Sequence, residues 1–143
     1  MNADTAFIQI NKPMDAVYAF MADPANLSLW SFGTWRTDID GTGLVRGTSI
    51  KDGAVIYVRI DAHPAQNLID YHVGSDPDSL LPRVFVRITP GAVFDVDGCA
   101  LTMTAMRSAG MDDARWHSLK AMHVTEVELI KGALETGYDH RNA

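Results

Sequence analysis

His123 and Glu126 are the residues of this chain whose types and spacing point most directly to chemistry. They are three positions apart, so on a helix they would be neighbours, and the carboxylate could orient or charge the imidazole. Imidazole and carboxyl groups are common proton carriers, so the pair is a candidate for general acid–base catalysis. Both interrupt an apolar stripe, and a titratable pair on such a face suggests the wall of a cavity.

Three interpretations of this pair remain open from the sequence. In the first, His123 is satisfied at the edge of the core and Glu126 reaches solvent, because carboxylates are rarely buried without a partner. In the second, His123 lines a cavity and forms a hydrogen bond with a ligand. In the third, His123 moves a proton in a reaction, with Glu126 as its assisting group.

The stripe belongs to a helix predicted from Asp112 to about Gly137. At about 100° per residue, one narrow sector of this helix holds its apolar side chains. These stripe residues are Trp116, Leu119, His123, Val127, Ile130 and Leu134. Charged residues occupy the other side, so the stripe should face the protein interior. Leu119 and Val127 are therefore expected to contact a ligand beside His123.

The section before this helix is predicted to be mostly β-strand. A strand over residues 5–10 comes first, and Pro13 and Asp23-Pro24 then begin two short helices, the second ending near Trp30. Glycine, proline and aspartate divide the following region into strands. The six expected strands are residues 35–40, 44–50, 54–62, 67–73, 83–89 and 99–107. Their short connections favour antiparallel pairing.

Alternation within these strands predicts which side chains face the core. The core-facing sets are Ile69, Tyr71 and Val73, then Val84, Val86 and Ile88, then Leu101, Met103 and Ala105. Met103 is flexible enough to adapt to a ligand, although methionine equally fills gaps in a core. Near Val58 two registers compete, because Ile56 and Ile60 favour one face whereas Val55, Tyr57 and Arg59 favour the other.

Aromatic residues supply further candidate ligand contacts. Trp30 and Trp35 lie where the second short helix leads into the sheet, and Trp116 begins the last helix on its inward face. Each is suited to core packing or to stacking on a planar ligand. Tyr57 and Tyr71 would supply polar contacts if their strands present those faces to the cavity. Tyr71 is the stronger candidate because its alternating neighbours are apolar.

Length and charge restrict the classes of function. A chain of 143 residues suits one domain spanning residues 1–143. The formal net charge of -6 opposes binding to nucleic acid. No apolar run approaches the length of a membrane span, and the first ten residues lack the pattern of a signal peptide. A cytoplasmic protein is therefore expected, and a homodimer is compatible with these properties.

No cofactor or metal is expected. Gly41, Gly43 and Gly47 resemble a dinucleotide fingerprint, but a strand follows them where that motif requires a helix N-terminus. The histidines show no recognisable metal-ligand spacing. Cys99 is the single cysteine and has no activating cation nearby in the sequence, so a buried structural thiol is expected.

The N-terminal third carries a family resemblance. Its residues are Ile10-Asn11-Lys12-Pro13, Val17-Tyr18, Phe20-Met21, Asp23-Pro24, Asn26 and Trp30. This pattern resembles the opening of START-like (SRPBCC) proteins, in particular the polyketide cyclase/dehydrase-like branch. The resemblance implies an α+β helix-grip fold, in which a seven-stranded curved antiparallel sheet surrounds a long C-terminal helix, with two short helices after strand 1.

The same resemblance implies a cavity between the sheet and the last helix. Members of this superfamily include lipid and hormone carriers and aromatase/cyclases, and they share no universal catalytic residue. The first expectation is therefore the binding of an apolar or aromatic small molecule. The alternative is a cyclase/dehydratase-type enzyme acting on a carbonyl compound, with much of its catalysis supplied by orientation. A protein-interaction module is less favoured, because no long exposed apolar stripe is evident.

Overall fold

The computed structural model describes residues 2–143 and contains one seven-stranded antiparallel sheet. The sheet order is β1-β7-β6-β5-β4-β3-β2, which confirms the predicted helix-grip architecture. The strands are β1 Ala3–Ile10, β2 Arg36–Ile39, β3 Val45–Thr48, β4 Val55–His63, β5 Leu68–Gly74, β6 Leu81–Pro90 and β7 Cys99–Met106. All predicted strands are present, with ends shifted by at most two residues.

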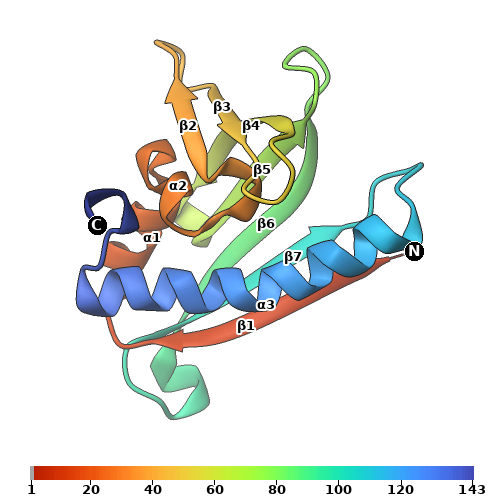
Figure 1. Ribbon diagram of the computed structural model, residues 1–143. Helices are drawn as coiled ribbons and strands as arrows, with labels where there is room; N and C mark the ends of the chain where they lie inside the picture. The colour runs from red at the N-terminus through yellow and green to blue at the C-terminus, as the bar shows by residue number, and fades with distance from the viewer. Residues whose placement is uncertain (1) are drawn as a thin grey trace.

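The helices lie on the inner side of the curved sheet (Figure 1). The long helix α3 spans Asp113–Thr136 and runs along β1 and β7. Its bounds agree with the prediction, because the Asp112 side chain accepts a hydrogen bond from the Arg115 N–H and Gly137 ends the helix in the left-handed conformation. Within residues 2–143, no helix combines the length and the apolar character needed to cross a membrane.

The segment between β1 and β2 closes one end of the sheet. Helix α1 spans Met14–Ala22 and buries Val17 and Met21. The second predicted short helix is divided into a 3-10 turn over Pro24–Asn26 and a single α-helical turn, α2, over Leu27–Trp30. α2 packs against α3, so this segment helps to enclose the space beneath the long helix (Figure 1).

Alternation places the predicted strand residues in the core. Ile69, Tyr71, Val86, Ile88, Leu101, Met103 and Ala105 are buried, and Val73 and Val84 pack against the core. Around Val58 the register is settled, because Val58 is buried and Ile56 and Ile60 pack against the same core. Tyr57 and Arg59 therefore lie on the opposite face of β4. Cys99 is a buried free thiol, as predicted.

The pairing between β5 and β6 contains a β-bulge. Tyr71 pairs with Val84, but His72 pairs with Pro82, so Arg83 is left as an extra residue on β6. The ladder between β6 and β7 begins at Val84, so Arg83 has no partner on that side either. A bulge interrupts strict alternation and can redirect a side chain.

Candidate functional site

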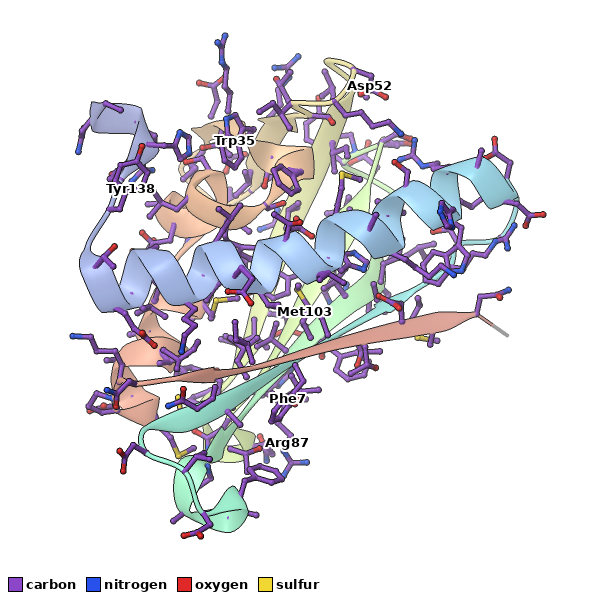
Figure 2. The ribbon with its side chains drawn as sticks, turned by 60° about the horizontal axis from the view of Figure 1, so that its bottom comes forward. Phe7, Trp35, Asp52, Arg87, Met103 and Tyr138 are labelled. Carbon is purple, nitrogen blue, oxygen red and sulfur yellow. The ribbon has the colours of Figure 1, made fainter. Side chains whose placement is uncertain are left out.

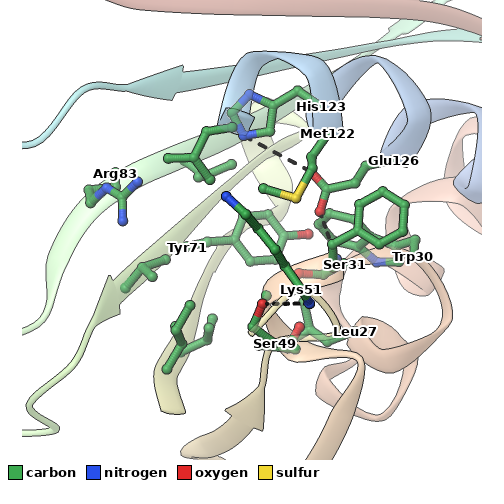
Figure 3. Close-up of a pocket in the computed structure, with 18 of the residues that line it drawn as sticks. Leu27, Trp30, Ser31, Ser49, Lys51, Tyr71, Arg83, Met122, His123 and Glu126 are labelled. Carbon is green, nitrogen blue, oxygen red and sulfur yellow. Dashed lines mark hydrogen bonds and ion pairs between the residues drawn. The ribbon is translucent and has the colours of Figure 1, made fainter. Parts of the chain in front are cut away.

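A cavity of about 120 Å³ lies between the inner face of the sheet and the N-terminal half of α3 (Figure 3). Its volume is many times the roughly 10–15 Å³ that one water molecule requires on this measure. Apolar side chains form much of its wall. They are Leu27, Trp30, Phe32, Ile56, Val58, Val73, Val84, Met103, Leu119 and Met122. The cavity also receives polar and charged groups, and these define its chemistry.

Five of the predicted ligand contacts line this cavity. They are Trp30, Tyr71, Met103, Leu119 and His123. They come from α2, β5, β7 and α3, so the fold brings together residues that are distant in the sequence. Glu126, the second member of the predicted pair, lines the same cavity.

The structure places the other four predicted contacts elsewhere. Trp35 stacks between the rings of Phe32 and His140, whose centroids lie 5.5 and 4.1 Å from its own. It therefore lies beside the C-terminal residues of the chain. Tyr57 lies on the opposite face of β4 from the cavity-lining Ile56 and Val58, because side chains alternate along a strand.

Trp116 and Val127 depart from the prediction because the cavity faces only part of the apolar stripe. Trp116 borders a separate depression beside Lys120, whose Nζ lies 5.9 Å from the indole centroid. Val127 is buried in the hydrophobic core. The cavity-facing residues of α3 follow helical spacing at Leu119, Met122, His123 and Glu126.

Glu126 is a buried carboxyl group with one defined partner. Its side chain is 9 % exposed, and the backbone N–H of Phe32 donates a hydrogen bond to Glu126 Oε2 at 3.0 Å. Burial raises the pKa of Glu126 to about 7, although the Phe32 hydrogen bond opposes this shift. The interpretation in which Glu126 reaches solvent is therefore wrong. Its partner is a backbone group 94 positions away, which no sequence pattern reveals.

His123 lies between two carboxyl groups. Its Nε2 is 4.0 Å from Glu126 Oε1, and its Nδ1 is 3.5 Å from Asp4 Oδ2. Burial lowers the pKa of His123, while the nearby Asp4 partly opposes the shift. The imidazole is therefore neutral at pH 7 and offers one donor and one acceptor nitrogen. Figure 3 shows the His123–Glu126 contact at the α3 wall of the cavity.

Tyr71 contributes mainly its ring to the cavity. Its hydroxyl donates a hydrogen bond to the Met21 carbonyl oxygen at 2.6 Å. Burial raises the pKa of this phenol above its ordinary value, so the hydroxyl stays protonated. The Trp30 ring meets Tyr71 edge to face, with centroids 5.9 Å apart. These contacts hold two aromatic surfaces in place at one side of the cavity.

Three basic residues that the sequence analysis did not select also line the cavity. They are Lys51, Arg83 and Arg115. Lys51 lies in the loop between β3 and β4, and its Nζ donates to Ser118 Oγ on α3 at 2.8 Å. Figure 3 shows this side chain extending across the cavity in front of Tyr71. Burial lowers the pKa of Arg83, and the charge of Arg115 adds to the shift.

A separate cluster of titratable side chains occupies β4 and β5. His63 Nε2 lies 3.2 Å from Asp61 Oδ2 and 3.4 Å from Asp70 Oδ2. Asp61, His63 and Asp70 each offer one potential metal ligand, all within 4.8 Å of one another. Spacing along the chain did not suggest this group, because the direct pairing of Asp61 with Asp70 depends on strand register.

Figure 2 shows where Met103, one of the cavity-lining residues, lies in the whole molecule. The labelled side chain of Met103 lies beneath α3, whereas Phe7 and Arg87 lie at the outer side of the sheet and Trp35 and Tyr138 lie toward the C-terminal end. The cavity is lined by α3, by the inner sheet face, by residues 27–34 and by the loop between β3 and β4.

Comparison with known proteins supports the fold and leaves the activity unassigned. No protein-family model matches the chain, and no curated protein matches it. Among solved structures, XoxI from Bacillus cereus has a TM-score of 0.71 at 12% identity, covering 98% of this chain and 100% of that one. The Aha1 dimer from Colwellia psychrerythraea has a TM-score of 0.69 at 16% identity, covering 97% and 100%.

A third similar structure is DynU16, a putative protein in the dynemicin biosynthetic locus. Its TM-score is 0.65 at 19% identity, and the match covers 96% of this chain but 48% of DynU16. These three neighbours share the overall fold of this chain. At such identities they define the fold alone.

Proposed function

We propose that this protein is a START-like small-molecule binding protein that holds an apolar or aromatic ligand between the sheet and α3. The observation that carries the proposal is the cavity itself, which has a mainly apolar wall and a few converging polar groups. That combination is typical of small-molecule sites. Trp30 and Tyr71 provide aromatic surface, and His123 provides a neutral imidazole for a hydrogen bond.

Native mass spectrometry of the purified, untagged protein tests this proposal. We expect a fraction of the protein to carry a non-covalent small molecule that is lost on denaturation. The stripped protein should then bind 2-naphthamide, a neutral aromatic probe, with one site per chain in calorimetry. Protein of unmodified mass that also fails to bind this probe would contradict the proposal.

His123→Ala is expected to weaken the binding of 2-naphthamide about tenfold with little change in stability. The imidazole is positioned to form a hydrogen bond with the ligand, and one such bond is worth about 0.5–1.5 kcal/mol. His117→Ala, at an exposed position of the same helix, is the matched control and should bind like the parent. Equal affinity of His123→Ala and the parent would remove His123 from the ligand contacts.

A second candidate function is proton transfer within the cavity, as in a cyclase/dehydratase-type enzyme. The observation that favours it is the raised pKa of Glu126, about 7, beside the neutral imidazole of His123. A group with a pKa near the working pH is well suited to acid–base catalysis. Incubation with a poly-β-ketone distinguishes the candidates: turnover that is abolished in His123→Ala supports the enzyme, whereas binding without product supports the carrier.

A further inference from the structure

Buried polar atoms without hydrogen-bond partners concentrate at the cavity. In residues 2–143 these side-chain atoms are Thr34 Oγ1, Arg83 Nε and His123 Nδ1, and all three residues line the cavity. His123 Nδ1 does lie 3.5 Å from Asp4 Oδ2, so Thr34 and Arg83 are the residues whose buried atoms have no polar neighbour of this kind. Thr34 and His123 are 1% and 7% exposed. Buried polar atoms in folded proteins are nearly always paired, and an unpaired one requires a specific explanation. Their common location indicates a ligand with polar groups as well as an apolar body.

The charges at the cavity favour a negative ligand. The chain is acidic, with 18 acidic and 12 basic residues, yet Lys51, Arg83 and Arg115 all line this one site. In the described part of the chain, none of these three cations forms an ion pair with a carboxylate.

The acidic groups at the cavity already have other partners. Asp52 Oδ1 accepts a hydrogen bond from the Ala54 N–H at 3.0 Å, and Glu126 accepts one from the Phe32 N–H. Asp52 is also exposed to solvent, as are Lys51 and Arg115, so water weakens the fields of all three inside the cavity. Arg83 is half-buried, and its positive charge therefore remains the one most available to a ligand.

The β-bulge explains why an arginine reaches this wall. Arg83 is the unpaired extra residue on β6, and both Arg83 and the next residue, Val84, line the cavity. In a regular strand two consecutive side chains would point to opposite faces. Bulges redirect side chains and occur frequently beside functional sites. Figure 3 shows Arg83 and Trp30 on opposite sides of the pocket, with Tyr71 between them.

We propose that the ligand is an organic acid whose carboxylate pairs with the Arg83 guanidinium while its apolar body contacts Trp30, Met103 and Leu119. This inference rests on the proposed function, because it specifies the ligand of the same cavity. A guanidinium has several donors in one plane and matches a carboxylate, and Arg83 lines the cavity without an ion-pair partner among the described residues. Arg115 adds a second positive charge at the same wall.

The test uses two probes of nearly equal shape that differ in charge, 2-naphthoate and 2-naphthamide. Calorimetry at pH 7.5 should show that the parent protein prefers the acid about tenfold, the size expected from a hydrogen bond to a charged group. Arg83→Gln should reduce this preference to about one, because it removes the charge that distinguishes the two probes. Arg83→Lys keeps the positive charge but lacks the planar set of donors, so it should retain part of the preference for 2-naphthoate.

Arg87→Gln is the matched control, because Arg87 is exposed on the same strand and does not line the cavity. It should preserve the preference for 2-naphthoate. Equal binding of the two probes by the parent would overturn the organic-acid inference and leave the small-molecule proposal standing. A preference that survives in Arg83→Gln, or an equal loss of both probes in a folded variant, would also overturn it. Failure of the parent to bind either probe would overturn both proposals.

Discussion

Glu126→Gln is expected to stabilise the protein at pH 8.5 by about 2–3 kcal/mol relative to the parent chain and to have little effect near pH 4.5. The reason is the raised pKa of the buried carboxyl group, about 7 against an ordinary value of 4.5. Ionisation of Glu126 in the folded protein places a charge on a largely buried side chain, where it is solvated less well than in water. Glutamine remains neutral, and its oxygen can still accept the Phe32 hydrogen bond.

The direction of the effect follows from proton binding. Between about pH 4.5 and pH 7 the folded chain keeps the Glu126 proton that the unfolded chain has released. The folded state therefore binds more protons in this range, and the contribution of Glu126 to stability falls as the pH rises. Above about pH 7 both states are ionised and the loss is complete.

Urea unfolding at pH 4.5, 7 and 8.5 measures this difference. Glu128→Gln, at an exposed position of the same helix, provides the control and should change stability equally at every pH. A difference between Glu126→Gln and the parent that stays constant from pH 4.5 to pH 8.5 would show that Glu126 is not held as a buried, protonated group.

Gly98→Ala is expected to destabilise the fold by about 3 kcal/mol or more. Gly98 adopts a φ of +69°, and a Cβ at this position would overlap the carbonyl oxygen of Ile10. The alanine would therefore add backbone strain and a collision with β1, which the neighbouring strand cannot easily relieve. Relief of this collision would also disturb the start of β7, where Ile10 pairs with Cys99.

Gly110→Ala separates the two contributions. Gly110 has a similar φ of +79°, but a Cβ there would meet no atom within 4 Å. Its replacement should cost only the backbone strain, about 1 kcal/mol. Denaturant unfolding of both variants measures the difference. Equal decreases in the free energy of unfolding would mean that the collision with Ile10 does not destabilise the fold.

The fold was predictable because its elements are encoded locally. Asp112 and Gly137 mark the ends of α3, and alternation at Ile69, Tyr71 and Val86 gives the inner face of the sheet. The order of these elements then limits the architecture. The inward face of the strand around Val58 could be assigned only from the structure, because apolar side chains occur on both of its faces.

The cavity was only partly predictable because its details depend on contacts between distant segments. The sequence placed His123 on the inward face of the helix but did not provide the Phe32 N–H that satisfies Glu126. Alternation also assumes a regular strand, so it could not anticipate that the bulge would add Arg83 to the wall. The stripe of α3 predicted an inward face without distinguishing the cavity from the adjacent core, which is why Val127 was misplaced.

The bridge between Lys51 and Ser118 has a consequence for the kinetics of ligand exchange. It joins the loop between β3 and β4 to α3 at the cavity by a single exposed hydrogen bond of 2.8 Å. Breaking such a bond costs about 0.5–1.5 kcal/mol, which slows entry by roughly tenfold at most. Exchange through this side is therefore governed by the contacts made inside the cavity, and residence time should follow affinity.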